Sequence, residues 1–381
     1  MEIPSLSQLL QFIQSLRGAA NAQRRLAQQI IALGYLEAAY IDIIDACQLK
    51  CPTCVRGLRV MQNSSAKMSL EKFCAVLDKA KSEGYRRIGL YSWTEPFLNR
   101  TLQDYVLEIK KRDLPCEIST TLSLRRIDNL EATLLAKPDL IYVSISGWDQ
   151  ATYQINHVGG NLSYVLANLE RAVSFVRSRG LTTTFQLKFI KFDYNASHEE
   201  PLRSHAAALG IKYEVIAGVG HPNAHPDTPF HARSLTDDFI RKQMAAAPEA
   251  SPETCGKICT LMFDFISIDC HGDVYICCAF PNQPSLRIGS YLDLSAQEIL
   301  LRRWTHSFCK TCNWPRREAT YIDKRRIRHA VASTFPPLAS ISLLHSRISS
   351  FSLGSRGSRT LGELYRRVAR APIIYSKPRR S

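Results

Sequence analysis

Between residues 40 and 220, short β-rich runs alternate with longer helical patterns, and this alternation limits the possible folds more than any other feature. Helical apolar spacing occurs near Ser69–Gly84, Leu102–Arg112, Asp128–Leu135, Asn161–Arg179 and His198–Leu209. Alternating strands and helices form a parallel sheet, so we expect an α/β fold, a partial (β/α)6 version of the TIM-like barrel. The strands that we expect are Tyr40–Ile44, Arg87–Tyr91, Glu117–Thr121, Ile141–Ile145, Thr183–Phe189 and Lys212–Ile216.

Polar and sulfur-bearing residues follow the ends of these expected strands. In folds of this class, chemistry collects where the strands end and their loops begin. We therefore expect one rim of the barrel to carry the functional residues, which are Cys47 after the first strand, Glu95 after the second, Thr121 and Ser123 after the third, Ser144 and Ser146 at the fourth, and Lys188 in the fifth.

Ten of the twelve cysteines fall into two groups. Cys47, Cys51 and Cys54 form the first group, in the spacing C-x3-C-x2-C. The second consists of Cys255, Cys259, Cys270, Cys277, Cys278, Cys309 and Cys312. The sequence has no apolar run long enough for a membrane span and begins without a secretory pattern, so we expect a cytoplasmic protein. Clustered cysteines in a reducing compartment more often bind metal than form disulfides.

The first cysteine group offers three thiolates and no nearby histidine. Thiolates suit zinc or iron–sulfur clusters, and four of them normally complete the site. A site with three protein ligands leaves one metal position open for a small molecule.

On the loop after the first strand of a six-unit barrel, Cys47, Cys51 and Cys54 resemble the cluster motif of the radical S-adenosylmethionine (SAM) superfamily. The resemblance implies that they hold a 4Fe–4S cluster whose fourth iron binds SAM. One-electron reduction in this family cleaves SAM to a 5′-deoxyadenosyl radical, which removes hydrogen from an unactivated carbon. The resemblance also implies a reductase partner such as flavodoxin or ferredoxin.

Further short motifs follow in the order that this family has them. Residues 91–99 (YSWTEPFLN) resemble its Gly-Glu-Pro motif, with Thr94 in place of glycine, which implies that Glu95 accepts hydrogen bonds from the SAM ammonium group. Residues 119–124 (STTLSL), with Thr121 and Ser123, resemble the segment that touches SAM. Ser144 and Ser146 lie in a segment similar to Ser-x-Asp-Gly, where Ser146 replaces the acid, and Thr53 stands where an aromatic residue is usual.

The second cysteine group resembles the SPASM or twitch-type auxiliary lobe of one branch of this superfamily. Gly272 and Cys277 match its G-x4-C pattern within FDFISIDCHGDVYICC, which itself has the pattern of a β-hairpin. The resemblance implies one auxiliary 4Fe–4S cluster with Cys259, Cys277, Cys309 and Cys312 as ligands, and with Cys255, Cys270 and Cys278 as competitors. Four cysteines in paired spacing also suit zinc, which remains the alternative.

Most of the net charge of +15 lies in the C-terminal tail. Fifteen Lys and Arg residues stand against three acidic residues between Arg316 and Ser381, which gives +12 for that segment and leaves +3 for the rest. We therefore do not expect the body to bind nucleic acid. The amphipathic tail either docks on the body with a solvated basic face or contacts anionic lipid, a polyanion or an acidic partner.

The expected organisation is an N-terminal helical segment (1–38), the barrel (39–220), a linker (221–254), a cysteine-rich auxiliary lobe of hairpin and helix (255–315) and the basic tail (316–381). The family resemblance implies an enzyme that removes a hydrogen atom from a carbon of a small, sugar-like molecule or of a peptide. An RNA-modifying member of the superfamily and a non-enzymatic zinc-binding adaptor are the alternatives. Three further residues are candidates for a site near the mouth of the barrel: His157, Lys188 and Lys191. The alternative for each is a solvated or salt-bridged side chain.

Overall fold

The computed structural model describes residues 36–57, 61–218, 264–278 and 282–308, together with Leu261 and Phe280. All of them belong to the first of the two units into which the chain divides, Met1–Lys324 and Arg325–Ser381. Among the described residues, no helix is both long enough and apolar enough to span a membrane. Residues 1–35 of the expected N-terminal segment, the linker and the tail lie outside the described residues.

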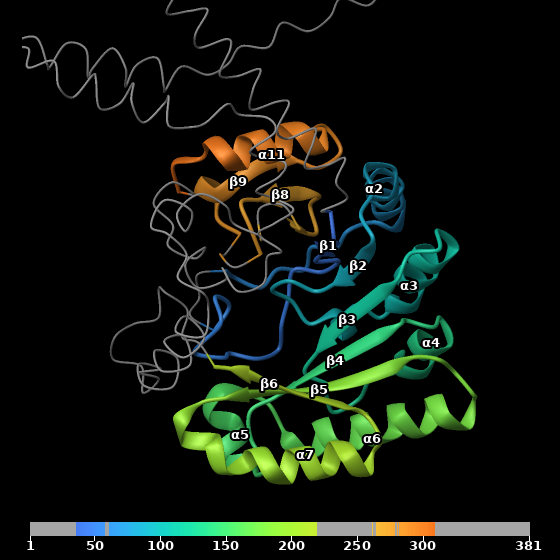
Figure 1. Ribbon diagram of the computed structural model, residues 1–381, viewed down its shortest axis with the longest axis vertical. Coiled ribbons are helices and arrows are strands. Elements are labelled where there is room, and N and C mark those ends of the chain that lie inside the picture. Colours follow the sequence, from blue (N-terminus) through green and yellow to red (C-terminus); the bar gives the residue numbers. More distant parts are fainter. Residues whose placement is uncertain are drawn as a thin grey trace, which may run out of the picture. The chain divides into compact units, whose positions relative to one another are not determined.

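Six parallel strands form the expected sheet (Figure 1). They are β1 (Ala38–Ile41), β2 (Arg87–Leu90), β3 (Cys116–Thr120), β4 (Leu140–Ile145), β5 (Thr184–Lys191) and β6 (Lys212–Ala217). The α/β class and the partial barrel are therefore confirmed. β1 begins two residues earlier than expected and ends at Ile41, three residues before the expected end. The next residue, Asp42, turns its carboxylate to the backbone N–H groups of residues 92 and 93.

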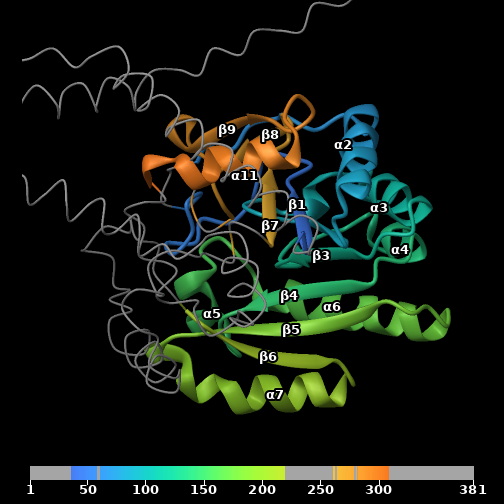
Figure 2. The same ribbon diagram turned by 45° about the horizontal axis from the view of Figure 1, so that its top comes forward.

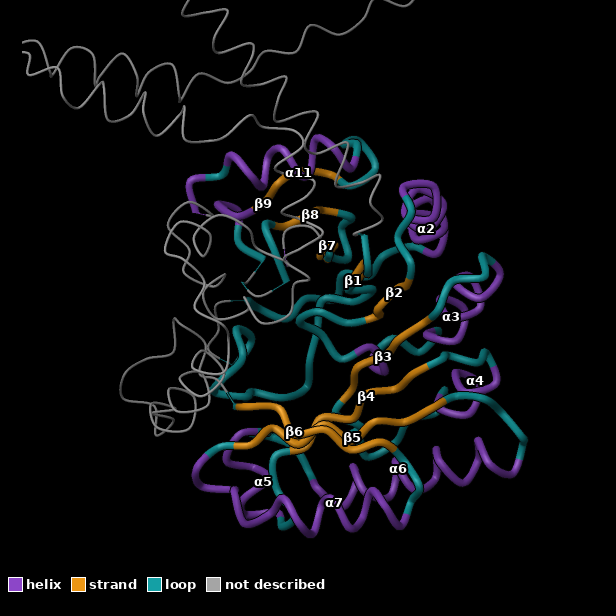
Figure 3. The backbone as a smooth tube through the Cα atoms, viewed as in Figure 1, coloured by secondary structure: helices purple, strands orange, loops and turns teal. Residues whose placement is uncertain are grey.

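Helices follow the strands and cover one face of this sheet (Figures 1 and 3). They are α2 (Leu70–Glu83), α3 (Leu102–Lys111), α4 (Leu130–Leu135), α6 (Leu162–Ser178) and α7 (Glu199–Ala208). Their beginnings and ends follow local chemistry: the Ser69 hydroxyl accepts from the N–H of Lys72 at the start of α2, and Gly84 ends it at φ 92°. Strand residues such as Ile41, Leu90, Ile118 and Val143 are fully or almost fully buried in the core.

Within the barrel, three short helical segments were not expected from the sequence: η1 (Pro96–Leu98), α5 (Gln150–Asn156) and η2 (Asp193–His198). α5 begins where the Asp149 carboxylate accepts from the N–H of Thr152 at 2.7 Å. Its seven residues are too few to show a helical period in the sequence, although the N-cap itself is recognisable.

The second cysteine region continues the same sheet, in the strand order β6-β5-β4-β3-β2-β1-β7-β8-β9. β7 (Phe265–Ile268) pairs parallel with β1, and β8 (Asp273–Tyr275) and β9 (Arg287–Ser290) follow antiparallel (Figure 2). η3 (Pro284–Leu286) precedes β9, and α11 (Ala296–Thr305) packs against it. The hairpin expected around residues 271–273 is confirmed, with Gly272 at φ 85° in its turn.

Candidate functional site

The three cysteines of the first group lie on the loop that leaves the carboxyl end of β1. A tight turn shapes this loop, since the N–H of Cys54 donates to the carbonyl of Cys51 at 3.0 Å. Gly57 allows the chain to fold back onto that turn, because a Cβ at Gly57 would lie 1.9 Å from the carbonyl oxygen of Cys51. No side chain can replace this glycine without moving the cysteine loop.

The thiols of Cys47, Cys51 and Cys54 share one environment. Burial raises the pKa of all three, that of Cys47 to about 12, and the charges of Cys54 and Cys47 further raise the pKa of Cys51. Over the part of the chain that the structure describes, no three His, Cys, Asp or Glu side chains converge as the ligands of a metal ion.

The cysteine loop is held against α5 and the turn that follows it. The hydroxyl of Thr53 donates to Asn156 Oδ1 at 2.7 Å, and the N–H of Lys50 donates to the carbonyl of Val158 at 2.9 Å. Thr53, the residue that stands where the resemblance has an aromatic side chain, is therefore an anchor of the loop.

Glu95 lies after β2 and is 1% exposed. Its Oε1 accepts from the Thr120 hydroxyl at 2.6 Å and from the N–H of Phe97 at 3.3 Å, while Oε2 accepts from the N–H and the hydroxyl of Thr121, both at 2.9 Å. Burial raises the pKa of Glu95, and these hydrogen bonds oppose the rise. Each carboxylate oxygen therefore already accepts two hydrogen bonds from the protein.

Gln48 connects the cysteine loop to Thr121 and Ser123. The amide Nε2 of Gln48 donates to the Thr121 hydroxyl at 3.2 Å and to the carbonyl of Ser123 at 3.3 Å. This contact links the residue after Cys47 to the end of β3. Sequence reasoning missed Gln48, since a lone glutamine in a loop carries no signal.

Ser144 and Ser146 have different surroundings at the end of β4. Ser144 is half-buried and pairs in register with Lys188 of β5. Ser146 is fully buried, and its hydroxyl lies 2.6 Å from His157 Nδ1 and 3.2 Å from the carbonyl of Tyr153. The serine that replaces the acid of the family segment thus binds α5 and the residue that ends it.

Tyr153 of α5 was not a candidate from the sequence. Its side chain is fully buried and stacks on the His157 ring at 4.7 Å, and its hydroxyl has no hydrogen-bond partner among the described residues. Burial raises the pKa of Tyr153, the nearby Ser123 hydroxyl lowers it, and the charges of Cys51, Glu95 and Cys47 raise it further. An unpaired buried hydroxyl therefore lies near the cysteines and the Glu95 carboxylate.

Lys188 and Lys191 both interact with acidic residues. Lys188 Nζ lies 3.5 Å from the centre of the Tyr142 ring and 3.9 Å from Glu214, and burial lowers its pKa. Lys191 forms an ion pair with Glu199 at 2.7 Å.

In the second group, Cys255, Cys259, Cys309 and Cys312 lie outside the described residues. Cys270 lies in the turn between β7 and β8, while Cys277 and Cys278 follow β8 at the other end of the hairpin. Cys270 is 4% exposed, and the carboxylates of Asp269, Asp45 and Asp42 raise its pKa beyond the effect of burial. The hairpin thus separates Cys270 from Cys277 and Cys278.

Comparison with known proteins supports this description. Residues 41–191 match the model of the radical SAM superfamily. No curated protein matches the sequence significantly. The Streptococcus suis protein SuiB bound to S-adenosylmethionine is similar in structure, with 13% identity over 73% of this chain and 71% of SuiB and a TM-score of 0.54.

Two further solved structures have the same fold. SuiB bound to its precursor peptide SuiA has a TM-score of 0.50 and 13% identity over 67% of this chain, which spans 63% of that SuiB chain. The structure of anSMEcpe with bound AdoMet has a TM-score of 0.51 and 14% identity, over 73% of this chain and 87% of that one. Residues 41–191 thus match the radical SAM superfamily in sequence, and the solved structures share the fold of this chain.

Proposed function

We propose that the chain is an enzyme that uses a 4Fe–4S cluster and SAM to remove a hydrogen atom from a carbon of a small-molecule or peptidyl substrate. The superfamily uses both cofactors. The observation that carries the proposal is the set of three thiols on one loop at the carboxyl end of β1. Cys47, Cys51 and Cys54 would hold the cluster, and the remaining iron would bind SAM.

The residues around this loop fit such cofactors. Three thiolates match the donor type that iron–sulfur clusters require, and they leave one position open. The unpaired hydroxyl of Tyr153, buried near Cys51 and Glu95, provides a donor for a polar group that is bound there. When bound, the cluster and SAM supply a radical that can take hydrogen from an unactivated carbon.

The residues of this chain have distinct parts in the proposed site. Thr121, Ser123 and Ser144 are candidate SAM contacts, with Thr121 and Ser123 bound to the cysteine loop through Gln48. Glu95 holds Thr121 with two hydrogen bonds, so its effect on SAM includes the position of Thr121. Ser146 would act through α5, since its hydroxyl binds groups on that helix and on His157.

For the substrate, we propose the sheet face opposite the helices. Half-buried Tyr40, Tyr91 and Tyr142 follow one another there, with ring centres 5.0 Å and 6.0 Å apart, and Lys188 lies over the last ring. Aromatic rings with polar tips can contact a sugar-like ring or a peptide. The precursor peptide bound by SuiB favours the peptide, although that similarity extends to the fold alone.

We also propose an auxiliary 4Fe–4S cluster that transfers electrons or helps to place the substrate, with Cys259, Cys277, Cys309 and Cys312 as ligands. The position of Cys270 and Cys277 at opposite ends of the hairpin argues against both thiols binding one cluster. A flavodoxin- or ferredoxin-type reductase would supply electrons in the cytoplasm. The basic tail remains a candidate contact for a membrane surface or a polyanion.

Anaerobic reconstitution of the full chain tests the function. We expect iron and sulfide in 4Fe–4S proportions, and 5′-deoxyadenosine when SAM and a strong reductant are added. Alanine at Cys47, Cys51 and Cys54 together should abolish the nucleoside, whereas Cys74→Ala on α2 should leave it. A protein that carries clusters but yields no 5′-deoxyadenosine would disprove the proposal.

The same preparation decides between the alternatives. Zinc without iron or sulfide would identify the adaptor. A salt-sensitive shift of RNA that disappears when residues 316–381 are deleted would support the RNA-modifying enzyme.

A further inference from the structure

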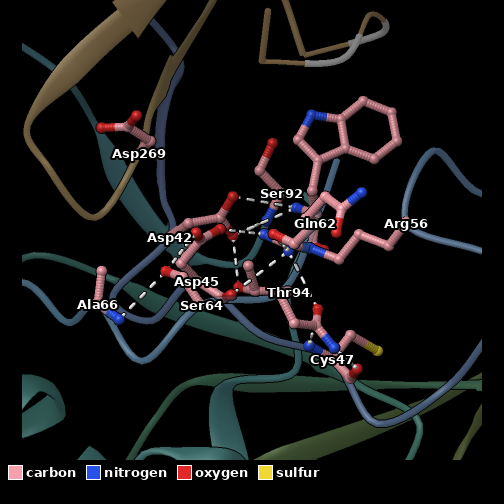
Figure 4. Close-up of polar contacts among 12 residues, drawn as sticks. Asp42, Asp45, Cys47, Arg56, Gln62, Ser64, Ala66, Ser92, Thr94 and Asp269 are labelled. Carbon is pink, nitrogen blue, oxygen red and sulfur yellow. Dashed lines mark hydrogen bonds and ion pairs between the residues drawn. The ribbon is translucent and has the colours of Figure 1, made fainter. Parts of the chain in front are cut away.

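Arg56, two residues after Cys54, is a buried cation with a side chain only 3% exposed. Its Nε donates to the carbonyl of Trp93 at 2.6 Å, and its Nη2 binds Asp45 Oδ1 at 2.5 Å (Figure 4). Its Nη1 reaches the carbonyl of Gln62 at 3.0 Å and Asn63 Oδ1 at 3.2 Å. A charged side chain is rarely buried unless its donors are satisfied, and here every nitrogen has an acceptor.

These contacts join both ends of the cysteine loop. Asp45 precedes Cys47, and Asn63 lies on the segment that returns from the loop. Asn63 also binds Cys47 directly: its Oδ1 accepts from the N–H of Cys47 at 3.1 Å, and its Nδ2 donates to the Cys47 carbonyl at 2.7 Å. The Arg56 guanidinium is therefore connected to the backbone of the first cysteine through one side chain.

Arg56 also connects the cysteine loop to the loop that carries Glu95. Arg56 binds the carbonyl of Trp93, while the Asp42 carboxylate accepts from the Trp93 N–H at 3.1 Å and from the Thr94 hydroxyl at 2.6 Å. The residues directly before Glu95 are thus held between a buried cation and a buried acid (Figure 4). A forked, planar guanidinium suits this role better than a single ammonium group.

The charge of Arg56 acts on the proposed cluster ligands. Its guanidinium lies two residues after Cys54 and binds Asn63, which in turn binds the Cys47 backbone, so its positive charge stands beside the loop that carries the thiols. Asp45 is its ion-pair partner, with a side chain 25% exposed. Charges and hydrogen bonds around the sulfur atoms are among the features by which a protein sets the reduction potential of a cluster.

We infer that Arg56, held by Asp45, is a positioning residue that fixes the cysteine loop to the Glu95 loop and, through its buried charge, raises the reduction potential of the cluster. The inference rests on the proposed function, since it requires a cluster on Cys47, Cys51 and Cys54. A nearby positive charge stabilises the reduced, more negative cluster, and a nearby negative charge disfavours it. Loss of Arg56 and loss of the Asp45 charge therefore have opposite effects on the potential.

Four variants of the reconstituted full-length protein test this inference: Arg56→Gln, Arg56→Lys, Asp45→Asn and Lys50→Gln. The potential is followed in a redox titration by the EPR signal that SAM alters. We expect Arg56→Gln to shift the potential down and Asp45→Asn to shift it up. Arg56→Lys keeps the charge, so it should leave the potential near the wild-type value while lowering the melting temperature of the apoprotein.

Lys50→Gln is the matched control, because it removes one positive charge directly beside Cys51 from an exposed side chain. Water and salt screen that charge, so the potential should not move. Shifts of the same sign in Arg56→Gln and Asp45→Asn, or no shift at wild-type iron content, would overturn the inference. If Arg56→Gln takes up no iron, Asp45→Asn still decides, because it retains Arg56. Wild-type protein without a cluster would instead refute the proposed function.

Discussion

The buried imidazole of His157 should make the stability of this protein depend on pH. His157 is 2% exposed, its Nδ1 lies 2.6 Å from the Ser146 hydroxyl, and its ring stacks on Tyr153. Burial lowers its pKa from 6.5 to about 4. The folded protein therefore keeps this ring neutral at a pH where the unfolded chain protonates it.

The sign and size of the effect follow from this difference in pKa. Between pH 6.5 and about 4 the unfolded state binds more protons at His157 than the folded state does. The contribution of this residue to the free energy of unfolding is therefore fully present above pH 6.5 and is lost as the pH decreases. At about pH 5 the loss from this one group is about 2 kcal/mol, and it levels off below pH 4.

Urea unfolding of the apoprotein at about pH 7.5 and about pH 5 measures the loss. His157→Gln cannot titrate, so its stability should fall by about 2 kcal/mol less than that of the wild type between these pH values, even if it is less stable at both. His271→Gln, which removes an exposed imidazole, is the control and should behave as the wild type. Equal losses in wild type and His157→Gln would show that the ring is not held neutral by burial.

Three other substitutions test the site. If the Tyr153 hydroxyl donates to SAM, Tyr153→Phe should weaken SAM binding by about 5- to 10-fold, the contribution of one hydrogen bond, without destabilising the apoprotein. Isothermal titration measures the affinity and thermal melting the stability, and an unchanged affinity would exclude this hydrogen bond. Glu95→Gln should destabilise the apoprotein by about 1–3 kcal/mol, because the amide NH2 group would face the Thr121 N–H, which is also a donor. Reduced SAM affinity at unchanged stability would instead indicate that Glu95 acts on SAM alone. Gly57→Ala should reduce iron uptake on reconstitution, and wild-type iron content would show that the loop adapts.

The strands were predictable within a few residues, because runs of branched and aromatic side chains such as those of β4 and β5 have a strong local signal. Since parallel strands carry their functional residues at one end, this pattern also placed Cys47, Glu95 and Thr121 near one another. In the structure, Thr121 binds Glu95 directly.

Interactions that depend on distant partners could not be predicted. The local sequence of Arg56 suggests an exposed charge, and only the approach of Asp45, Asn63 and Trp93 explains its burial. The hydrogen bonds that the buried Glu95 carboxylate accepts likewise depend on Thr120 and Thr121, at the end of the neighbouring strand. Neither the spacing of residues nor their type contains this information.

The pairing of β7 with β1 connects the two cysteine groups within one sheet. The N–H of Asp42 donates to the carbonyl of Ile268 at 2.9 Å, and the hydroxyls of Ser92 and Ser267 lie 3.1 Å apart. The Phe265 ring stacks on Tyr40 at 5.3 Å, and burial, followed by the charge of Cys278, raises the pKa of that tyrosine. Because backbone pairing and buried side chains cross this junction, a hinge between barrel and hairpin would break several hydrogen bonds at once. The described cysteines of both groups should therefore keep a fixed separation, and a fixed separation would suit the proposed electron transfer between them better than a moving lobe would.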